Sequence, residues 1–335
     1  MKRILKIIKY LAIGILVLFL FFTIGGLIIK SKGQNDINRE ALLNEGGKLA
    51  LDQNGRKIEY FTYGSTDTNA LVVINMHGSG LDGTFEKLVH QKSCKELNVR
   101  GISISLPGYG NTDVKIGRSV IDWASEDLNA VLHLENVNKF MITGHSQGNP
   151  HAMAAAFHFK ERCIGLGMNA PFLPNNLTRE INIEGALGYE QLKTTEELKN
   201  PLNAWWFFTI YLSTDIFSPS LPLSALIYTD ENIEDDSTLL EMVSYSIKRS
   251  VIRGSVGSSW ESAKDVCYDW GFDPREIHEV YQHLLNSGKI DSVTVLATHF
   301  ACANNLSNEM TTRQIECFDK TVQEIDREKL EKKFS

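Results

Sequence analysis

The chain begins with an uninterrupted apolar block. Residues 10–29 carry no charge, and about 20 apolar residues are enough for a helix to span the hydrocarbon core of a bilayer. Basic residues flank this block on both sides: Lys2, Arg3, Lys6 and Lys9 before it, Lys30 and Lys32 after it. We therefore expect a single-pass membrane anchor over residues 1–32, with the main domain luminal or extracellular. A cleaved signal peptide is the alternative, although its apolar region would usually be shorter, at about 7–15 residues.

Short apolar runs then alternate with helix-like segments. The runs are short enough for fully buried strands, and they cover residues 71–76, 101–105, 140–143 and 163–169. Helix-like segments separate them at residues 85–97 and 120–134. An Asn54-Gly55 pair between two earlier strand-like runs predicts a hairpin. The pattern is typical of a mostly parallel sheet covered by helices on both faces.

The domain organisation follows from where this pattern stops and resumes. Residues 33–44 are polar and predict a linker, and the α/β core is expected over 45–171 and 263–335. Between them, residues 172–262 are helix-like and rich in aromatics, which favours a helical cap inserted over the sheet. One aromatic cluster, Trp205 to Phe208, is open to two interpretations, core packing or substrate contact.

The end of the run at 140–143 carries the strongest chemical signal. It leads into Gly144-His145-Ser146-Gln147-Gly148 and then into a segment rich in small residues. This G-x-S-x-G pattern between a strand and a helix is typical of a nucleophile elbow, in which only small residues fit beside the serine. The elbow would expose the hydroxyl of Ser146 and turn the amide of Gln147 toward a developing oxyanion.

Composition narrows the classes of protein to which the chain can belong. The 335 residues carry a net charge of −7, with 43% hydrophobic and 22% charged residues, as in a globular protein. No basic stripe and no zinc-type cysteine spacing is present, so we expect no nucleic-acid partner, no metal and no cofactor.

Several motifs in order resemble the α/β-hydrolase superfamily, in its cap-containing serine hydrolase branch. They comprise the loop at 76–80, the Pro-Gly-Tyr-Gly turn within 106–113, the elbow at 144–150, a re-entry segment at 269–273, and 288–291 with the residues after it. The resemblance runs from about residue 45 to 318. It implies an α/β-hydrolase fold with a helical cap, here preceded by one transmembrane helix.

The same resemblance assigns roles to individual residues. Ser146 would be the nucleophile, and amides of Gln147 and of Gly78 or Ser79 would form the oxyanion hole. Asp291 matches the position of the triad acid. A serine at the elbow argues against the aspartate-nucleophile branches, such as epoxide hydrolases.

The base is where the chain departs from the family. A triad histidine is expected within residues 315–321, and none is there. His299, eight residues past Asp291, is the remaining weak candidate. Three explanations compete: an altered C-terminal sequence, an unusual base, or a catalytically impaired relative. We therefore expect a membrane-anchored serine hydrolase acting on an ester, lipid or other small acyl substrate, or alternatively a ligand-binding or scaffold protein on the same fold.

Overall fold

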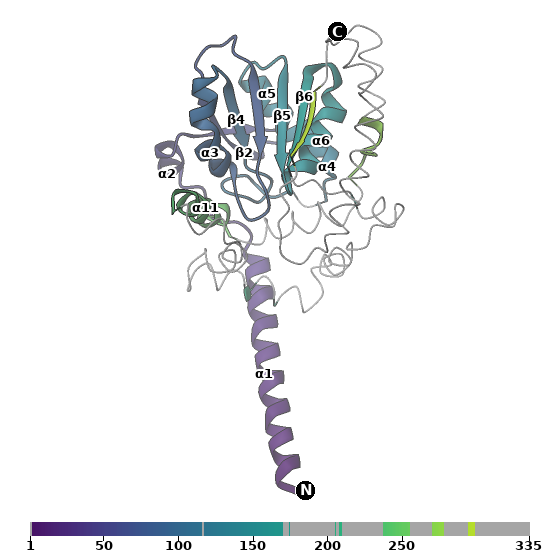
Figure 1. The fold of residues 1–335 in the computed structure, drawn as a ribbon. Coiled ribbons are helices and arrows are strands. Elements are labelled where there is room, and N and C mark those ends of the chain that lie inside the picture. Colours follow the sequence, from purple (N-terminus) through teal and green to yellow (C-terminus); the bar gives the residue numbers. More distant parts are fainter. Residues whose placement is uncertain are drawn as a thin grey trace.

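A computed structural model describes residues 2–115, 117–169, 174, 205, 208–209, 237–254, 270–277 and 294–298. Its first element, α1 (Lys2–Lys32), projects from the main domain as a single long helix (Figure 1). Within the segment Lys2–Ile28, an 18-residue window has a mean hydropathy of 2.8, and only 6% of that window is buried. Among the described residues α1 is the one helix long and apolar enough to cross a membrane. The expectation of a spanning-length N-terminal helix is confirmed.

One seven-stranded sheet forms the centre of the main domain, in the order β1-β2-β4-β3-β5-β6-β7. The strands are β1 (Gly47–Leu51), β2 (Lys57–Gly64), β3 (Val72–Met76), β4 (Arg100–Ile104), β5 (Phe140–His145), β6 (Cys163–Asn169) and β7 (Thr294–Thr298). β1 and β2 are an antiparallel hairpin, and Gly55 in its turn has the left-handed φ of 77° that glycine adopts without strain. In the order of the sheet, neighbouring strands are parallel from β4 through β3, β5 and β6 to β7. The predicted hairpin and the mostly parallel sheet are both confirmed.

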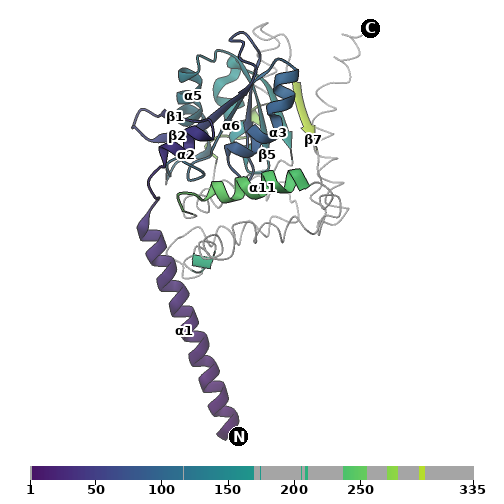
Figure 2. The ribbon, with the colours of Figure 1, turned by 90° about the vertical axis from the view of Figure 1, so that its left-hand side faces the viewer.

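Helices cover both faces of the sheet. α3 (Gly83–Glu96) packs on β2 and β4, and α5 (Asn129–Leu134) lies on the opposite side (Figure 2). α5 continues α4 (Val120–Trp123) through a single π-helical turn, η1 (Ala124–Leu128), and α6 (Gly148–Phe159) packs beside them on β5 and β6. The short elements α2 (Arg39–Asn44) and η2 (Lys160–Arg162) complete this part. Trp123 and Trp270 are fully buried in the core.

The carboxyl ends of the parallel strands face the side from which α1 extends (Figures 1 and 2). Hydrogen bonds fix this arrangement just after α1. The side chain of Gln34 donates to the carbonyl oxygen of Thr112 at 3.1 Å and accepts from the amide of Val114 at 2.8 Å. Both partners belong to the loop that follows β4. The exit of α1 is therefore tied to the carboxyl edge of the sheet.

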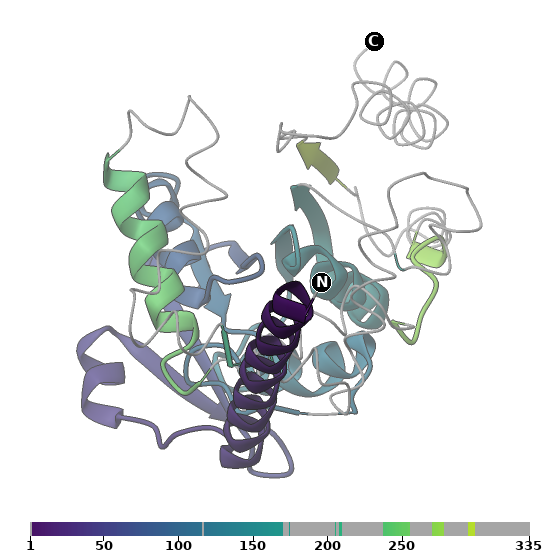
Figure 3. The same ribbon diagram turned by 90° about the horizontal axis from the view of Figure 1, so that it is seen from below.

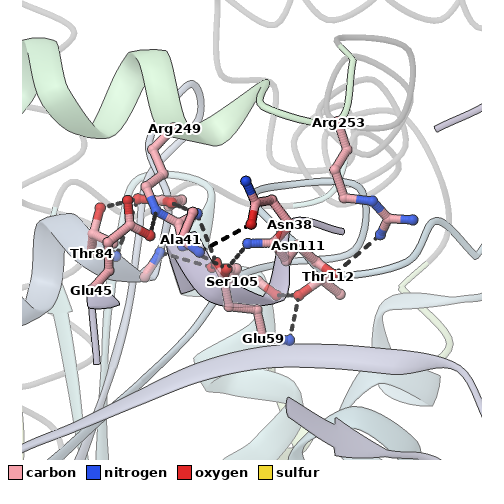
Figure 4. A network of polar contacts seen from close by, with 12 residues as sticks. Asn38, Ala41, Glu45, Glu59, Thr84, Ser105, Asn111, Thr112, Arg249 and Arg253 are labelled. Carbon is pink, nitrogen blue, oxygen red and sulfur yellow. Dashed lines mark hydrogen bonds and ion pairs between the residues drawn. The ribbon is translucent and has the colours of Figure 1, made fainter. Parts of the chain in front are cut away.

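Most of the expected cap, residues 172–262, lies outside the described residues. Its main described element is α11 (Ser237–Ser250), which packs on α3 and lies between the sheet and the level of α1 in Figure 2. A buried polar network fixes α11 to the core (Figure 4). The guanidinium of Arg249 pairs with Glu59 at 2.9 Å, with Asp82 at 3.4 Å and with Glu45 at 2.6 Å.

Candidate active site

Ser146 occupies the turn between β5 and α6. Its φ of 49° lies in the left-handed region, which is uncommon for a residue other than glycine. The surrounding chain holds this conformation on both sides. The Ser146 amide donates to the carbonyl oxygen of Asn169 at 3.0 Å, and the Ser146 carbonyl accepts from the amide of Asn149 at 3.0 Å. The turn has the sharp strand-to-helix geometry that the sequence predicts.

The two glycines of the elbow are required by close backbone contacts. A Cβ atom at Gly148 would lie 2.3 Å from the carbonyl oxygen of Met76, at the end of β3. A Cβ atom at Gly144 would lie 2.7 Å from the Cα atom of Asn149, in the first turn of α6. Because these neighbours are backbone atoms, no side-chain rotation relieves the overlap. The packing of α6 against β3 and β5 therefore depends on glycine at both positions.

Asn149 stands where another glycine is common in the hydrolase motif, and the structure gives it a function. Its side-chain Nδ2 donates to the carbonyl oxygen of Ser146 at 2.9 Å and to that of Asn169 at 2.7 Å. One amide thus links the elbow to the carboxyl end of β6. A local sequence pattern does not show this link, because Ser146 and Asn169 are 23 residues apart in the chain.

The loop after β3 lies directly beside the elbow. Gly78 is buried, and a Cβ atom on it would lie 3.4 Å from the Cβ of Ser146 and 3.0 Å from Nδ1 of His145. Ser79, the next residue, is exposed. The structure therefore brings together the proposed nucleophile and the loop expected to supply an oxyanion donor.

Hydrogen bonds of the His77 ring hold this loop in place. Its Nε2 accepts a hydrogen bond from the amide of Leu106 at 2.9 Å, and its Nδ1 donates to the carbonyl oxygen of Gly78 at 2.9 Å. Burial lowers the pKa of His77 to about 4, so the ring is neutral at physiological pH. Both ring nitrogens are used by backbone groups, which makes His77 a structural residue of the loop.

Tyr109 connects the loop and the elbow. Its hydroxyl donates to Oε1 of Gln147 at 2.8 Å, and its ring packs edge-on against His77 at 5.0 Å between centroids. Tyr109 and Gln147 are both buried. The sequence placed Tyr109 in a recognisable turn without a role, since the tyrosine and the elbow are joined only in the folded chain.

The proposed acid and base, Asp291 and His299, lie outside the described residues. The strand between the two candidates is described. β7 runs parallel to β6, with Thr294 opposite Gly165 and Thr298 opposite Asn169. The carboxyl end of β7 is therefore at the same edge of the sheet as the elbow.

Comparison with known sequences identifies a second similarity, confined to the C-terminal part. Residues 270–334 match the model of the alanine racemase N-terminal domain family. Over 49 residues the chain is 45% identical to the catabolic alanine racemase of Pseudomonas putida and to the alanine racemase of Pseudomonas taetrolens. Each match covers 15% of this chain and 13% of the racemase, so only a small part of those enzymes is represented. The matched segment contains Asp291 and His299.

Comparison with solved structures concerns a larger share of the chain. A candidate epoxide hydrolase from Klebsiella pneumoniae subsp. pneumoniae superposes with a TM-score of 0.52 at 13% identity, covering 81% of this chain and 86% of that one. A thermophilic esterase from Thermogutta terrifontis gives a TM-score of 0.49 at 16% identity, covering 83% and 98%. Together with the strand order and the elbow after β5, the first superposition shows that this chain has the α/β-hydrolase fold.

Proposed function

We propose that the protein is a membrane-anchored serine hydrolase that acts on an ester, lipid or other small acyl substrate through Ser146. The observation that carries the proposal is the left-handed backbone of Ser146, next to the buried Gly78. Strained backbone in a non-glycine residue is concentrated at functional sites. The fold and the esterase and epoxide hydrolase structures that share it support hydrolytic chemistry.

In the proposed reaction, the hydroxyl oxygen of Ser146 forms a bond to the acyl carbon as the bond to the leaving alcohol breaks. The alcohol departs with the serine's proton, and water then releases the acid and restores the serine. Amides of Gln147 and of Gly78 or Ser79 would stabilise the oxyanion in both steps.

Asp291 and His299 remain the proposed acid and base. The register of β7 supports them unequally. His299 directly follows Thr298, which lies opposite Asn169 at the edge that carries the elbow. Asp291 precedes Thr294, at the other end of the strand. The assignment of Asp291 therefore rests on the motif resemblance alone.

A catalytically impaired, ligand-binding or scaffold relative is the second candidate function. Two observations favour it: residues 315–321 contain no histidine, and residues 270–334 follow the sequence pattern of alanine racemases. A C-terminal segment of a different sequence family would lack the hydrolase base, and loss of the base in a serine triad costs several orders of magnitude in rate.

Ester turnover separates the two candidates. The full chain in detergent or lipid is assayed with an activated aryl ester, with and without imidazole, which substitutes for a missing histidine. A hydrolase gives turnover that Ser146→Ala abolishes in both conditions. If the wild-type chain and Ser146→Ala give the same background rate in both, Ser146 is not a nucleophile.

The membrane anchor is tested separately. α1 is long enough to span a bilayer, and a retained anchor keeps the mature chain in the membrane pellet after a carbonate wash. Release of the mature chain into the supernatant, with residues 1–32 removed, would instead identify a cleaved signal sequence.

A further inference from the structure

Trp205, from the aromatic cluster in the expected cap, packs on the N-terminal helix. Its indole N–H donates to the carbonyl oxygen of Phe19 and to the hydroxyl of Thr23, both at 2.9 Å. Its ring lies 5.2 Å from that of Phe19 and 5.1 Å from that of Phe22. A donor placed in hydrocarbon must find its acceptor within the protein, and here α1 supplies two.

Phe208 packs on the same face of α1. Its ring lies 5.4 Å from Phe21 and 5.5 Å from Phe22, both edge-on. The contact depends on a small residue, because a Cβ atom at Gly25 would lie 2.7 Å from the Phe208 ring. Glycine at a helix contact is typical of packing within membranes, where small residues let partners approach closely.

The position of this contact along α1 places it within a bilayer leaflet. At 1.5 Å of rise per residue, Thr23 lies about 10 Å and Phe19 about 16 Å from the level of Lys30. Half of the hydrocarbon core is about 15 Å thick. If Lys9 and Lys30 mark the ends of the span, Phe19 lies at about the midplane. The contacts of Trp205 with Thr23 and of Phe208 with Gly25 then lie in the leaflet next to the main domain.

The catalytic edge of the sheet faces the same way. Beside the Gln34 contacts, the amide of Asn35 donates to the carbonyl oxygen of Arg253 at 3.0 Å, and Nε of Arg253 donates to that of Asn35 at 2.6 Å. Arg253 also pairs with Asp113 at 2.7 Å, in the loop after β4. Short contacts thus join the membrane exit of α1, the end of α11 and the edge that carries Ser146. Figure 3 views the domain from this side, with α1 pointing toward the reader.

We propose that the segment carrying Trp205 and Phe208 is embedded beside α1 in the leaflet next to the main domain, and that the acyl substrate is a lipid of that leaflet. The substrate part rests on the proposed hydrolase function. The lipid's acyl group would pass to Ser146 and then to water, releasing a fatty acid and the remaining alcohol.

The depth of residue 209 in the membrane is measured first, because this measurement does not require the protein to be catalytically active. Thr209, exposed and next to Phe208, is replaced by cysteine and labelled with a polarity-sensitive fluorophore in the full chain in phosphatidylcholine vesicles. Leu97, 73% exposed and three residues before β4 at the opposite edge of the sheet, gives the matched control label. The wild-type chain corrects for labelling of native cysteines. We expect lipids with spin labels on the acyl chain to quench the label at 209 and not the label at 97.

Activity is measured next with a matched pair of variants on α1. Gly25→Leu introduces a side chain against Phe208, whereas a Cβ atom at Gly14, the site of the control variant Gly14→Leu, would have no atom within 4 Å. We expect Gly25→Leu to reduce quenching at 209 and to lower Ser146-dependent hydrolysis of vesicle phospholipid at least fivefold, with soluble-ester turnover unchanged. Gly14→Leu should change neither.

Two results would overturn the proposal. If the label at 209 is quenched no more than the label at 97, the segment is not embedded in the membrane. If the protein turns over the soluble ester but does not hydrolyse vesicle lipid, a lipid is not its substrate. If the label at 209 is quenched and Ser146 turns over neither substrate, the embedded segment stands. The proposed hydrolase function then fails, and the lipid substrate fails with it.

Discussion

The amide of Ser146 donates a 3.0 Å hydrogen bond to the carbonyl oxygen of Asn169, which fixes the turn after β5 to the carboxyl end of β6. Because of this bond, the amide of Ser146 is already used as a donor within the sheet. An oxyanion at Ser146 must therefore be stabilised by other donors, and Gln147 and Gly78 are the neighbours proposed for that role. The elbow is a rigid part of the sheet edge, as a preorganised site requires.

The elbow should tolerate no side chain at Gly148. In Gly148→Ala, the new methyl group would overlap the carbonyl oxygen of Met76, so we expect a loss of about 1–3 kcal/mol of stability. Gly165→Ala is the matched control, because the nearest atoms to its methyl group would belong to the flexible side chain of Met141 and not to the backbone. Thermal unfolding in detergent compares the two, and an equal effect on the melting temperature would contradict the close packing of the elbow.

The network around Arg249 should be a major source of stability for α11. Arg249→Met leaves the fully buried Glu59 and Asp82 without a cation, which costs about 3–5 kcal/mol for a buried pair. Adding Glu59→Gln should restore part of the loss. Arg275→Met, which breaks an exposed pair with Asp273, should cost less than about 1 kcal/mol. Similar losses for Arg249→Met and Arg275→Met would show that the network contributes little.

The same network should make stability depend on pH. Burial raises the pKa of Asp82 to about 7, while Arg249 lowers it and Glu59 raises it. Between about pH 4 and pH 7 the folded chain then keeps a proton that the unfolded chain has lost. Stability therefore falls as pH rises through this range.

Asp82→Asn removes this titration and keeps an acceptor for the amide of Thr84 at the start of α3. We expect the variant, compared with wild type, to be relatively more stable at pH 8 than at pH 5. Parallel melting curves across this range would contradict the raised pKa.

The base can be tested at His299. If His299 accepts the proton of Ser146, His299→Gln should lower ester turnover at least tenfold, and imidazole should restore part of it. His133→Gln, on the exposed end of α5, is the control and should have no effect. Unchanged turnover in His299→Gln would exclude this histidine as the base.

Much of the fold was predictable because buried strands are short, apolar and separated by helices. The runs at 71–76, 101–105 and 163–169 match β3, β4 and β6 to within one residue at each end. The elbow was predictable because its glycines lie within two residues of the serine in sequence.

Contacts between distant residues were not predictable. Arg249 meets Glu59 across 190 residues, and Trp205 meets Phe19 across 186. No local pattern encodes such pairs. The aromatic cluster suggested core packing or substrate contact, whereas Trp205 and Phe208 pack on α1. The C-terminal motifs were short enough to resemble a hydrolase acid loop while the longer segment matches alanine racemases.

The central claim is that Ser146 is a nucleophile, and covalent labelling tests it most directly. The full chain in lipid is treated with a fluorophosphonate, with and without imidazole, and the adduct is located by peptide mass spectrometry. We predict a single phosphonyl adduct on the peptide that contains Ser146, absent in Ser146→Ala. Folded protein that carries no adduct at Ser146 under either condition would contradict the account.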